Sequence, residues 1–484
     1  MEEAQLIIGG RDVAAKNSAT FARKNPISGE DATRAAAATP EDAKAAVDAA
    51  AAAFPKWSAI GPNERRAKLN KAAELLEQRA QQFATLVSAE TGATMGWGFF
   101  NIHLAAGMLR EAAAMTTQIQ GEVVPSDVPG NLAMAVRQPL GVILGIAPWN
   151  APIILGVRAI AMPLACGNTV ILKASEVCPA THRLIAATLR DAGLGDGVVN
   201  VITHEPKDAE KIAEALISHP AVKRVNFTGS TRVGKILAAM AAKYLKPILL
   251  ELGGKAPIVV LEDADIDQAV NATVFGAYAN QGQICMSTER VIVDEKIADE
   301  FAAKLAKRVA ALPSGDPRKG DVVLGSVVGQ PTVDRVNKLV KDAVAKGAKV
   351  LTGAEPATST IMKGIVVDRV TPDMELFREE SFGPQVSITR AKDTEDAIRL
   401  ANDTEYGLSA ALHTRDIAKG IELAKRIETG ICHINGPTVA DEPQMPFGGV
   451  KASGYGRFGG KAGIDAFTEL RWITVQLSPR HYPF

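Results

Sequence analysis

Short apolar runs alternate with helical segments along the chain from residue 140 onward. The apolar runs are rich in β-branched residues and read GVILGIA, NTVILK, VVNVI, VKRVNFT and PILLEL. The segments between them include THRLIAATLRDAG and DAEKIAEALISH, which have helical patterns. This alternation predicts βαβ units that build a parallel sheet with helices on both faces.

A second block with the same alternation begins near Ala256. It contains the apolar runs IVV and ERVIVD, followed by DEFAAKLAKRVAAL and VNKLVKDAVAKGAKVLTG. Only the pair Gly253-Gly254 marks the break between the blocks, and no low-complexity linker separates them. We therefore expect two α/β domains that pack closely together.

The first 120 residues read mainly as helices. Thr39 supplies an N-cap for a helix that starts at Pro40, carries acidic residues in its first turn and continues through an alanine-rich run. A second long helix is predicted from about Asn63 to Glu90, where apolar residues recur at three- and four-residue spacing.

One uncharged stretch imitates a membrane span. No charged residue occurs from Pro139 to Val157, but Pro148, Asn150 and Pro152 fall within it, where they would leave helix backbone groups unpaired in lipid. The stretch is interpreted as a buried strand, a polar turn and a core helix. The N-terminus starts with acidic residues and has no apolar h-region, which argues against a signal peptide. We expect a soluble protein.

Composition narrows the classes of function. The 54 basic and 54 acidic side chains balance to a net charge of zero, which argues against nucleic-acid binding and against a polybasic membrane surface. Four Cys in 484 residues cannot form a disulfide framework, and no CxxC pair suggests a metal site. A reducing cytoplasm is the expected compartment.

Two glycine-rich patterns resemble nucleotide-binding motifs. Gly454, Gly456 and Gly459 fit G-x-G-x-x-G but follow a loop near the C-terminus, so a chance match is the preferred interpretation. Gly229 to Lys235 nearly spells a P-loop, but Ile236 stands where the Mg²⁺-binding Ser or Thr should be. The alternatives left are a pyrophosphate site at a helix start, with the hydroxyl of Ser230, and a plain strand–helix connection.

Three polar residues stand at positions suited to catalysis. Cys285 lies among small and polar neighbours in NQGQICMSTER, although a Cys is also commonly a small buried hydrophobe. Glu251 ends the strand PILLEL, where α/β folds place ligands and where burial raises a carboxyl pKa, or else it is a strand-end cap. Asn150, framed by two prolines in PWNAP, is either an oxyanion donor or a turn residue.

Together these segments resemble the aldehyde dehydrogenase superfamily over essentially the whole chain. The segments occur in the order PWNAP, LKASE, FTGSTRVG, LELGGKAP, GQICMS, EESFGP and PFGGVKASGYGR. The resemblance implies an α/β fold with a Rossmann-like parallel-sheet NAD-binding domain (1–120 and 140–252) and a second α/β catalytic domain (253–450). It also implies a small β oligomerisation arm (121–139 and 468–484), so we expect a homodimer or a dimer of dimers.

The resemblance also implies roles at individual positions. Cys285 matches the nucleophile, Glu251 the general base, and Asn150 an oxyanion donor beside the Cys285 backbone N–H. Lys173 and Glu176 match the pair that holds the adenosine ribose, and the glutamate favours NAD over NADP. The remaining expected cofactor contacts are Ile146, Pro148, Trp149, Gly229, Ser230, Glu380 and Phe382.

The chain departs from the family pattern near the expected substrate tunnel. Ala159 stands where many relatives have a lysine linked to proton relay, and Arg158 stands where many have a large apolar residue. Arg158, with Trp97, is a candidate substrate contact that would bind a hydroxyl on an aromatic aldehyde, or else it pairs with a carboxylate in the tunnel wall. The chain is most similar to bacterial aromatic-aldehyde dehydrogenases, which makes salicylaldehyde the expected substrate. Benzaldehyde, vanillin and an aliphatic semialdehyde are the alternatives.

The implied reaction is thiolate attack by Cys285, hydride transfer to NAD, and hydrolysis of the resulting thioester by water that Glu251 activates. A CoA-acylating enzyme typically lacks the base, so Glu251 argues against that alternative. A P-loop switch would need a hydroxyl at position 236, and a non-catalytic protein on this fold would be expected to have lost the thiol or the base.

Overall fold

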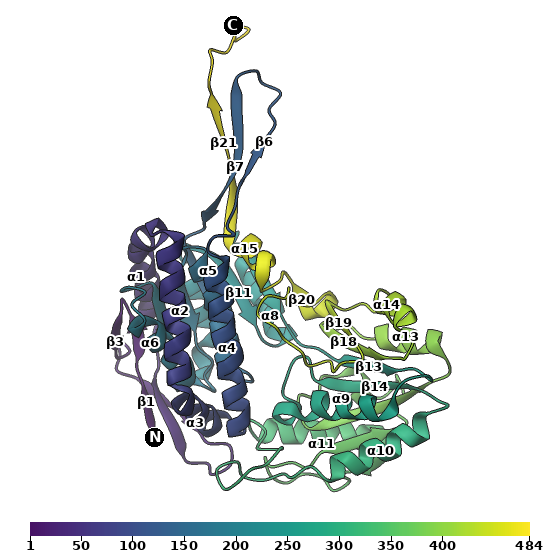
Figure 1. Ribbon diagram of the computed structural model, residues 1–484. Helices are drawn as coiled ribbons and strands as arrows, with labels where there is room; N and C mark the ends of the chain where they lie inside the picture. The colour runs from purple at the N-terminus through teal and green to yellow at the C-terminus, as the bar shows by residue number, and fades with distance from the viewer.

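Two large, mainly parallel sheets organise the chain, and the computed structural model describes all residues 1–484 (Figure 1). The first sheet has the order β20-β12-β11-β8-β9-β10-β2-β3. Its five central strands are parallel: β8 (Val142–Ile146), β9 (Thr169–Lys173), β10 (Val199–Ile202), β11 (Val222–Thr228) and β12 (Ile248–Glu251). Antiparallel strands complete its edges: β20 (Gly454–Tyr455), β2 (Leu6–Ile8) and β3 (Arg11–Val13).

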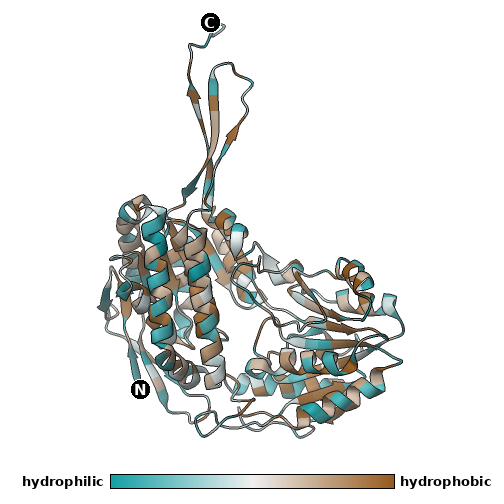
Figure 2. Ribbon diagram, in the orientation of Figure 1, coloured by the Kyte–Doolittle hydropathy of each residue, from teal (hydrophilic) through white to brown (hydrophobic).

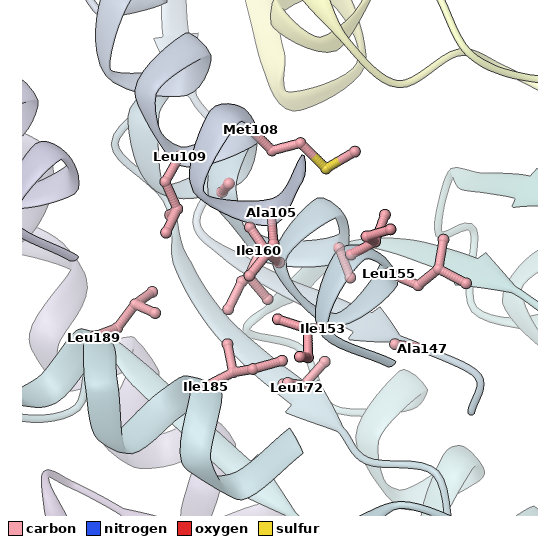
Figure 3. Packing of buried hydrophobic residues seen from close by; sticks show 14 of the residues in the cluster. Ala105, Met108, Leu109, Ala147, Ile153, Leu155, Ile160, Leu172, Ile185 and Leu189 are labelled. Atoms are coloured by element: carbon pink, nitrogen blue, oxygen red, sulfur yellow. The ribbon is translucent and has the colours of Figure 1, made fainter. Parts of the chain in front are cut away.

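Helices cover both faces of this sheet, because its central strands are apolar on both sides. One face carries α1 (Pro40–Ala59), α7 (Ala209–Ile217) and α8 (Thr231–Lys243). The other carries α5 (Pro152–Ala165) and α6 (Pro179–Asp191), with α4 (Met95–Met115) packed outside α5. Figure 3 shows this second layer, in which apolar side chains of α4, α5, α6 and β9 interdigitate.

The second sheet has the order β15-β16-β17-β14-β13-β18-β19 and is parallel except at β15. Its strands are β13 (Ala256–Val260), β14 (Thr288–Asp294), β15 (Lys349–Thr352), β16 (Ile365–Asp368), β17 (Gln385–Ala391), β18 (Ser409–His413) and β19 (Ile431–Ile434). Its helices are α9 (Ile266–Tyr278), α10 (Ala298–Ala310), α11 (Gln330–Ala345), α12 (Glu375–Arg378), α13 (Thr394–Asn402) and α14 (Ile417–Ala424). In Figure 2 the strands are mostly hydrophobic and the outer helices have hydrophilic faces.

A three-stranded antiparallel sheet projects from the body as an arm (Figure 1). It consists of β6 (Glu122–Val124), β7 (Asn131–Pro139) and β21 (Thr468–Gln476). The two segments predicted to form the arm, 121–139 and 468–484, therefore pair with each other through β7 and β21. Their outer edges remain open, and Trp472 is 80% exposed.

The N-terminal region differs from the predicted helical pattern. The first 36 residues form strands, of which β1 (Glu2–Ala4), β4 (Thr20–Lys24) and β5 (Asp31–Ala36) make a small separate sheet. These strands are short and show no clear alternation of apolar and polar residues. Pairing with distant segments stabilises them, so their own sequence did not reveal them.

The single helix predicted from about Asn63 to Glu90 is two helices. They are α2 (Pro62–Gln78) and α3 (Ala80–Thr91), and Arg79 between them leaves helical geometry with φ −94° and ψ 14°. The Arg79 guanidinium donates to Asp191 (2.5 Å) and Thr188 (3.0 Å) on α6. The break accompanies a tertiary contact that apolar spacing cannot reveal.

The C-terminal glycine pattern is a chance match, as expected. Gly454 lies in edge strand β20, which runs antiparallel to β12, so the pattern opens no βαβ unit. The segment 451–467 lies outside every predicted domain; it supplies β20 and helix α15 (Gly460–Phe467), which packs on α4 and α5. None of the helices is long and apolar enough to cross a membrane.

Candidate active site

The candidate site lies where the chain order reverses in the first sheet. Strands β8 and β11 are adjacent and parallel, yet their connections lead to opposite sides, so a crevice opens beyond their carboxyl ends. The turn after β8 carries Asn150, the turn after β11 carries Ser230, and Glu251 is the last residue of β12. Sheet topology therefore brings together three residues that the sequence singled out.

Cys285 comes to this crevice from the second sheet, on the loop between α9 and β14. Two residues of the loop, Asn280 (φ 48°) and Gln281 (φ 57°), adopt left-handed backbone conformations that few side chains tolerate. Asn280 Nδ2 donates to the Asn150 carbonyl (2.8 Å), and Gln281 Nε2 donates to the Ser326 carbonyl (2.9 Å). These hydrogen bonds offset the strain and fix the loop against the turn after β8.

Gly254 allows the loop to approach closely. A Cβ atom at this position would lie 2.3 Å from the carbonyl oxygen of Cys285, so any side chain here would displace the cysteine. The Gly253-Gly254 pair therefore marks a backbone crossing at the site, in addition to a break between domains.

Asn150 is held as a hydrogen-bond donor. Its Nδ2 donates one proton to the carbonyl of Gln283 (3.0 Å), which leaves the second N–H of the amide free. Its own carbonyl accepts from Trp97 Nε1 (2.9 Å) in addition to Asn280. The backbone N–H of Cys285 donates to no other protein group. Two unused donors thus lie beside the thiol.

Two cavities meet at Cys285 and Asn150, which line both of them. The larger, of about 880 Å³, is mainly apolar. Its inner lining includes Trp97, Phe100, Leu104, Ile154, Leu155, Arg158, Val439 and Phe447. The smaller, of about 380 Å³, is lined by Glu251 and by the predicted residues Pro148, Trp149, Gly229, Ser230, Glu380 and Phe382. The thiol is therefore accessible from two chemically different sides.

Glu251 is buried, and its carboxylate contacts the Cys285 thiol but has no other hydrogen-bond partner. Burial raises its pKa to about 8, and the nearby positive charge of Arg158 opposes the shift. Burial, followed by the charge of Glu251, also raises the pKa of the Cys285 thiol well above its ordinary value. Near pH 7 both groups are mainly protonated, so the thiolate forms only when its proton is removed during reaction.

Arg158 lies in the wall of the larger cavity and pairs with Asp441. Its side chain is 6% exposed, and the Phe447 ring covers the guanidinium with 4.1 Å to the ring centroid. Of the two alternatives for Arg158, the carboxylate pair is therefore present. The Nη1 and Nε groups of Arg158 donate to no protein group and are free for a further hydrogen bond.

Comparison with known proteins agrees with this geometry. Residues 13–473 match the profile of the aldehyde dehydrogenase family. The chain is 60% identical to a vanillin dehydrogenase of Pseudomonas fluorescens over 100% of both chains, and 48% identical to a salicylaldehyde dehydrogenase of Pseudomonas putida over 99% of both. The crystal structure of a salicylaldehyde dehydrogenase from Pseudomonas putida in complex with salicylaldehyde superposes with a TM-score of 0.98, at 48% identity and 100% coverage of both chains.

The chain belongs to the aldehyde dehydrogenase family. It is therefore an oxidoreductase that acts on aldehydes, with the aldehyde dehydrogenase fold and a nicotinamide dinucleotide, NAD or NADP, as cofactor.

The smaller cavity fits the cofactor of an aldehyde dehydrogenase. Ser230 caps helix α8, accepting from the N–H of Val233, and the N–H groups of Thr231 and Arg232 donate to no protein group. Unpaired N–H groups at a helix start suit a pyrophosphate. The Trp149 ring meets Phe382 edge-on at 5.8 Å between ring centroids, so two aromatic rings contribute apolar surface to this cavity.

Three predicted cofactor residues do not line this cavity. Ile146 and Lys173 are paired in register at the carboxyl ends of β8 and β9, and both are buried. Glu176 follows in the turn after β9 and is partly exposed. Burial lowers the pKa of Lys173, and the charge of Glu176 opposes that shift. The two residues expected to hold the adenosine ribose are thus electrostatically linked, outside the cavity that contains Cys285.

Several residues of the site have no signal in the sequence. Arg335 and Thr332 line the smaller cavity from the start of α11, and Asp441 pairs with Arg158 across 283 positions. Glu289 lies four residues after Cys285, and in the sequence it is recognisable only as the first residue of a predicted strand. The structure has no cluster of three metal-ligating side chains.

Proposed function

We propose that this protein oxidises a ring-hydroxylated aromatic aldehyde to the carboxylic acid, with NAD as the hydride acceptor. The observation that carries the proposal is the position of Cys285 and Asn150 between an apolar cavity and a cavity lined by most of the expected cofactor residues. Aromatic side chains, Trp97, Phe100 and Phe447, line the apolar cavity and suit a planar ring.

The choice of aldehyde rests on the relatives. Vanillin and salicylaldehyde, named for the relatives at 60% and 48% identity, are both benzaldehydes with a ring hydroxyl. The higher identity makes vanillin the first candidate and salicylaldehyde, which the sequence alone ranked first, the second. Arg158 supports this class, because its unpaired N–H groups lie in the wall of this mainly apolar cavity and can donate to a ring hydroxyl.

In the first step the Cys285 sulfur attacks the carbonyl carbon and forms a C–S bond, while the thiol proton passes to solvent water in the cavity. The oxygen of the tetrahedral adduct becomes an oxyanion within reach of the free N–H of Asn150 and the N–H of Cys285. One such donor contributes roughly 3 kcal/mol to the transition state. Because both groups are fixed before substrate enters, little reorganisation is needed.

When bound, an oxidised nicotinamide would supply the hydride acceptor for this adduct, and Cys285 would then carry the acyl group as a thioester. Glu251, whose pKa is about 8, takes a proton from water in its ionised form, which becomes more populated as pH rises toward 8. The hydroxide attacks the thioester through a second oxyanion held by the same donors. Cleavage of the C–S bond releases the acid, and the thiolate takes back the proton that Glu251 received from water.

Glu176 supports NAD over NADP. Its carboxylate beside the buried Lys173 at the end of β9 would accept hydrogen bonds from the ribose hydroxyls and repel a 2′-phosphate. The cofactor preference follows from that repulsion.

The arm supports a homo-oligomer, a dimer or a dimer of dimers. Strands β6 and β21 have open edges, and the arm exposes apolar side chains, including Val123, Leu470 and Trp472. Open edges and apolar surface of this kind are usually covered in solution, and a second copy of the chain is the proposed cover.

The test is an NADH absorbance assay of the purified full-length protein. Vanillin, salicylaldehyde, benzaldehyde and an aliphatic semialdehyde are compared, each with NAD and with NADP. The proposal expects the highest kcat/KM for a hydroxylated benzaldehyde with NAD. A preference for the aliphatic semialdehyde would overturn the aromatic assignment, and equal use of NADP would overturn the cofactor assignment.

A further inference from the structure

The loop between α12 and β17 presents two side chains to the smaller cavity from either side of a buried residue. Glu380 and Phe382 both line the cavity, whereas Ser381 between them is fully buried. Alternate residues thus face opposite ways, so the position of Ser381 determines where its two neighbours lie.

All three polar groups of Ser381 are hydrogen-bonded. Its N–H donates to both carboxylate oxygens of Glu289 (2.9 Å each), and its carbonyl accepts from Arg335 Nε (2.9 Å). Its hydroxyl accepts from Gln385 Nε2 (2.5 Å). The next N–H, that of Phe382, also donates to Glu289 (3.0 Å). One carboxylate therefore accepts from two consecutive backbone amides of the loop.

Glu289 is itself held by a buried ion pair. Lys255 Nζ donates to the Glu289 carboxylate, and the two side chains are 0% and 5% exposed. Lys255 follows the Gly253-Gly254 turn after Glu251, and Glu289 lies four residues after Cys285 on the neighbouring parallel strand. The pair thus ties the loop to the two segments that carry the thiol and the base.

Phe382 has a backbone conformation that needs this support. Its φ of 48° lies in the left-handed region, which an aromatic residue adopts only where surrounding contacts over-determine it. The Glu380 carboxylate is fixed in a similar way, because it accepts from the N–H of Gly254 (2.9 Å). Without the Glu289 acceptor, two buried N–H groups would lose their partner and the strained conformation would lose its anchor.

We propose that Glu289, charge-balanced by Lys255, is a positioning residue that sets cofactor affinity by fixing Ser381 and Phe382, without touching the cofactor. The loop forms one wall of the cavity that fits the nicotinamide dinucleotide, and Glu289 lines neither cavity. The inference rests on the NAD(P) use of the family and is independent of which aldehyde is oxidised.

Two double variants separate the acceptor from the charges. K255M/E289Q removes both charges but keeps an amide oxygen at the carboxylate position. K255M/E289L removes both charges and the acceptor. Replacing a buried ion pair by uncharged side chains of similar volume is often neutral for stability, so both variants are expected to fold.

The unliganded variants are compared by NAD calorimetry and by hydrogen exchange at the amides of Ser381 and Phe382. We expect K255M/E289L to weaken NAD binding about tenfold or more and to speed exchange at both amides, since two buried hydrogen bonds are lost. K255M/E289Q should stay within about threefold of the wild type in NAD affinity, because it keeps the acceptor. The KM for aldehyde should change little in either variant.

Equal NAD affinity in the two double variants would overturn the proposal, as would slow exchange at both amides in K255M/E289L. If K255M/E289L is insoluble, E289Q alone supplies the test. It leaves the Lys255 ammonium in competition for the amide oxygen, so faster exchange and weaker NAD binding are expected, and wild-type values for both would refute the role. Failure to oxidise aromatic aldehydes would affect only the function proposed above.

Discussion

Asp441 accepts a charged hydrogen bond from Arg158 in the wall of the larger cavity, where the Phe447 ring covers the guanidinium. The two side chains are 9% and 6% exposed, and Asp441 Oδ1 has no hydrogen-bond partner. A buried pair of this kind fixes the direction of the arginine and leaves its other N–H groups available.

The first prediction concerns the substrate hydroxyl. R158M/D441N removes both charges and should reduce kcat/KM for vanillin by about tenfold or more relative to benzaldehyde, since one charge-assisted hydrogen bond is lost. The ratio of the two substrates is the measurement, because any change in the pKa of Glu251 affects both. An unchanged ratio would make the pair purely structural. Arg158→Ala alone is a poorer test, because it leaves Asp441 buried without a partner.

Cys285→Ala should abolish aldehyde oxidation, because no other residue of the site can form the thioester. Binding of NAD, measured by calorimetry, should remain nearly unchanged. The matched control is Cys166→Ala, at a buried cysteine whose pKa burial raises to about 12 and which lines neither cavity. Activity retained in the first variant, or lost in a folded second one, would contradict the assignment of the nucleophile.

Glu251→Gln should stall hydrolysis of the thioester. A pre-steady-state burst of NADH followed by slow turnover is the expected stopped-flow result, with steady-state kcat lower by about 100-fold or more. In the wild type, kcat should rise with pH toward a pKa of about 8, since the base acts when ionised, and the variant should lose this rise. Loss of the burst itself would mean that Glu251 acts before hydride transfer.

The raised pKa of Glu251 also predicts a pH dependence of stability. The folded state binds this proton up to about pH 8, whereas the unfolded state releases it near the ordinary value of 4.5, so the folded state loses stability as pH rises between these values. The free energy of unfolding of Glu251→Gln, measured by denaturant titration, should therefore improve relative to the wild type by up to about 1.4 kcal/mol per pH unit in that window. A pH-independent difference would show that the carboxyl is not held neutral.

Trp472→Glu should dissociate the proposed oligomer, because it replaces the most exposed aromatic side chain on the strands of the arm by a charged one. Light scattering coupled to gel filtration would measure a smaller species at the same protein concentration. Val344→Glu, at an exposed apolar residue on α11, is the control and should leave the mass unchanged. A wild-type protein that is already monomeric would refute the role of the arm.

Local patterns in the sequence predicted the parts of the fold that local forces control. Thr39 caps α1 through a capping box with Asp42, as its spacing indicated, and the uncharged stretch before Arg158 forms β8 and α5. The sequence-based prediction was wrong in two places: it missed the helix break at Arg79 and the N-terminal strands. Both depend on contacts with residues far along the chain, and hydrophobic periodicity carries no information about these.

The candidate site also has features that the sequence determines and others that only the tertiary structure determines. The residue types of Cys285, Glu251 and Asn150 are properties of the sequence, and seven motif segments in order, three of which contain these residues, predicted an aldehyde dehydrogenase. The meeting of two cavities at the thiol, the Asp441 partner of Arg158 and the Glu289 anchor of Ser381 are products of tertiary structure. These pairs join residues 283 and 92 positions apart, and only the path of the folded chain determines which buried charges and amides face each other.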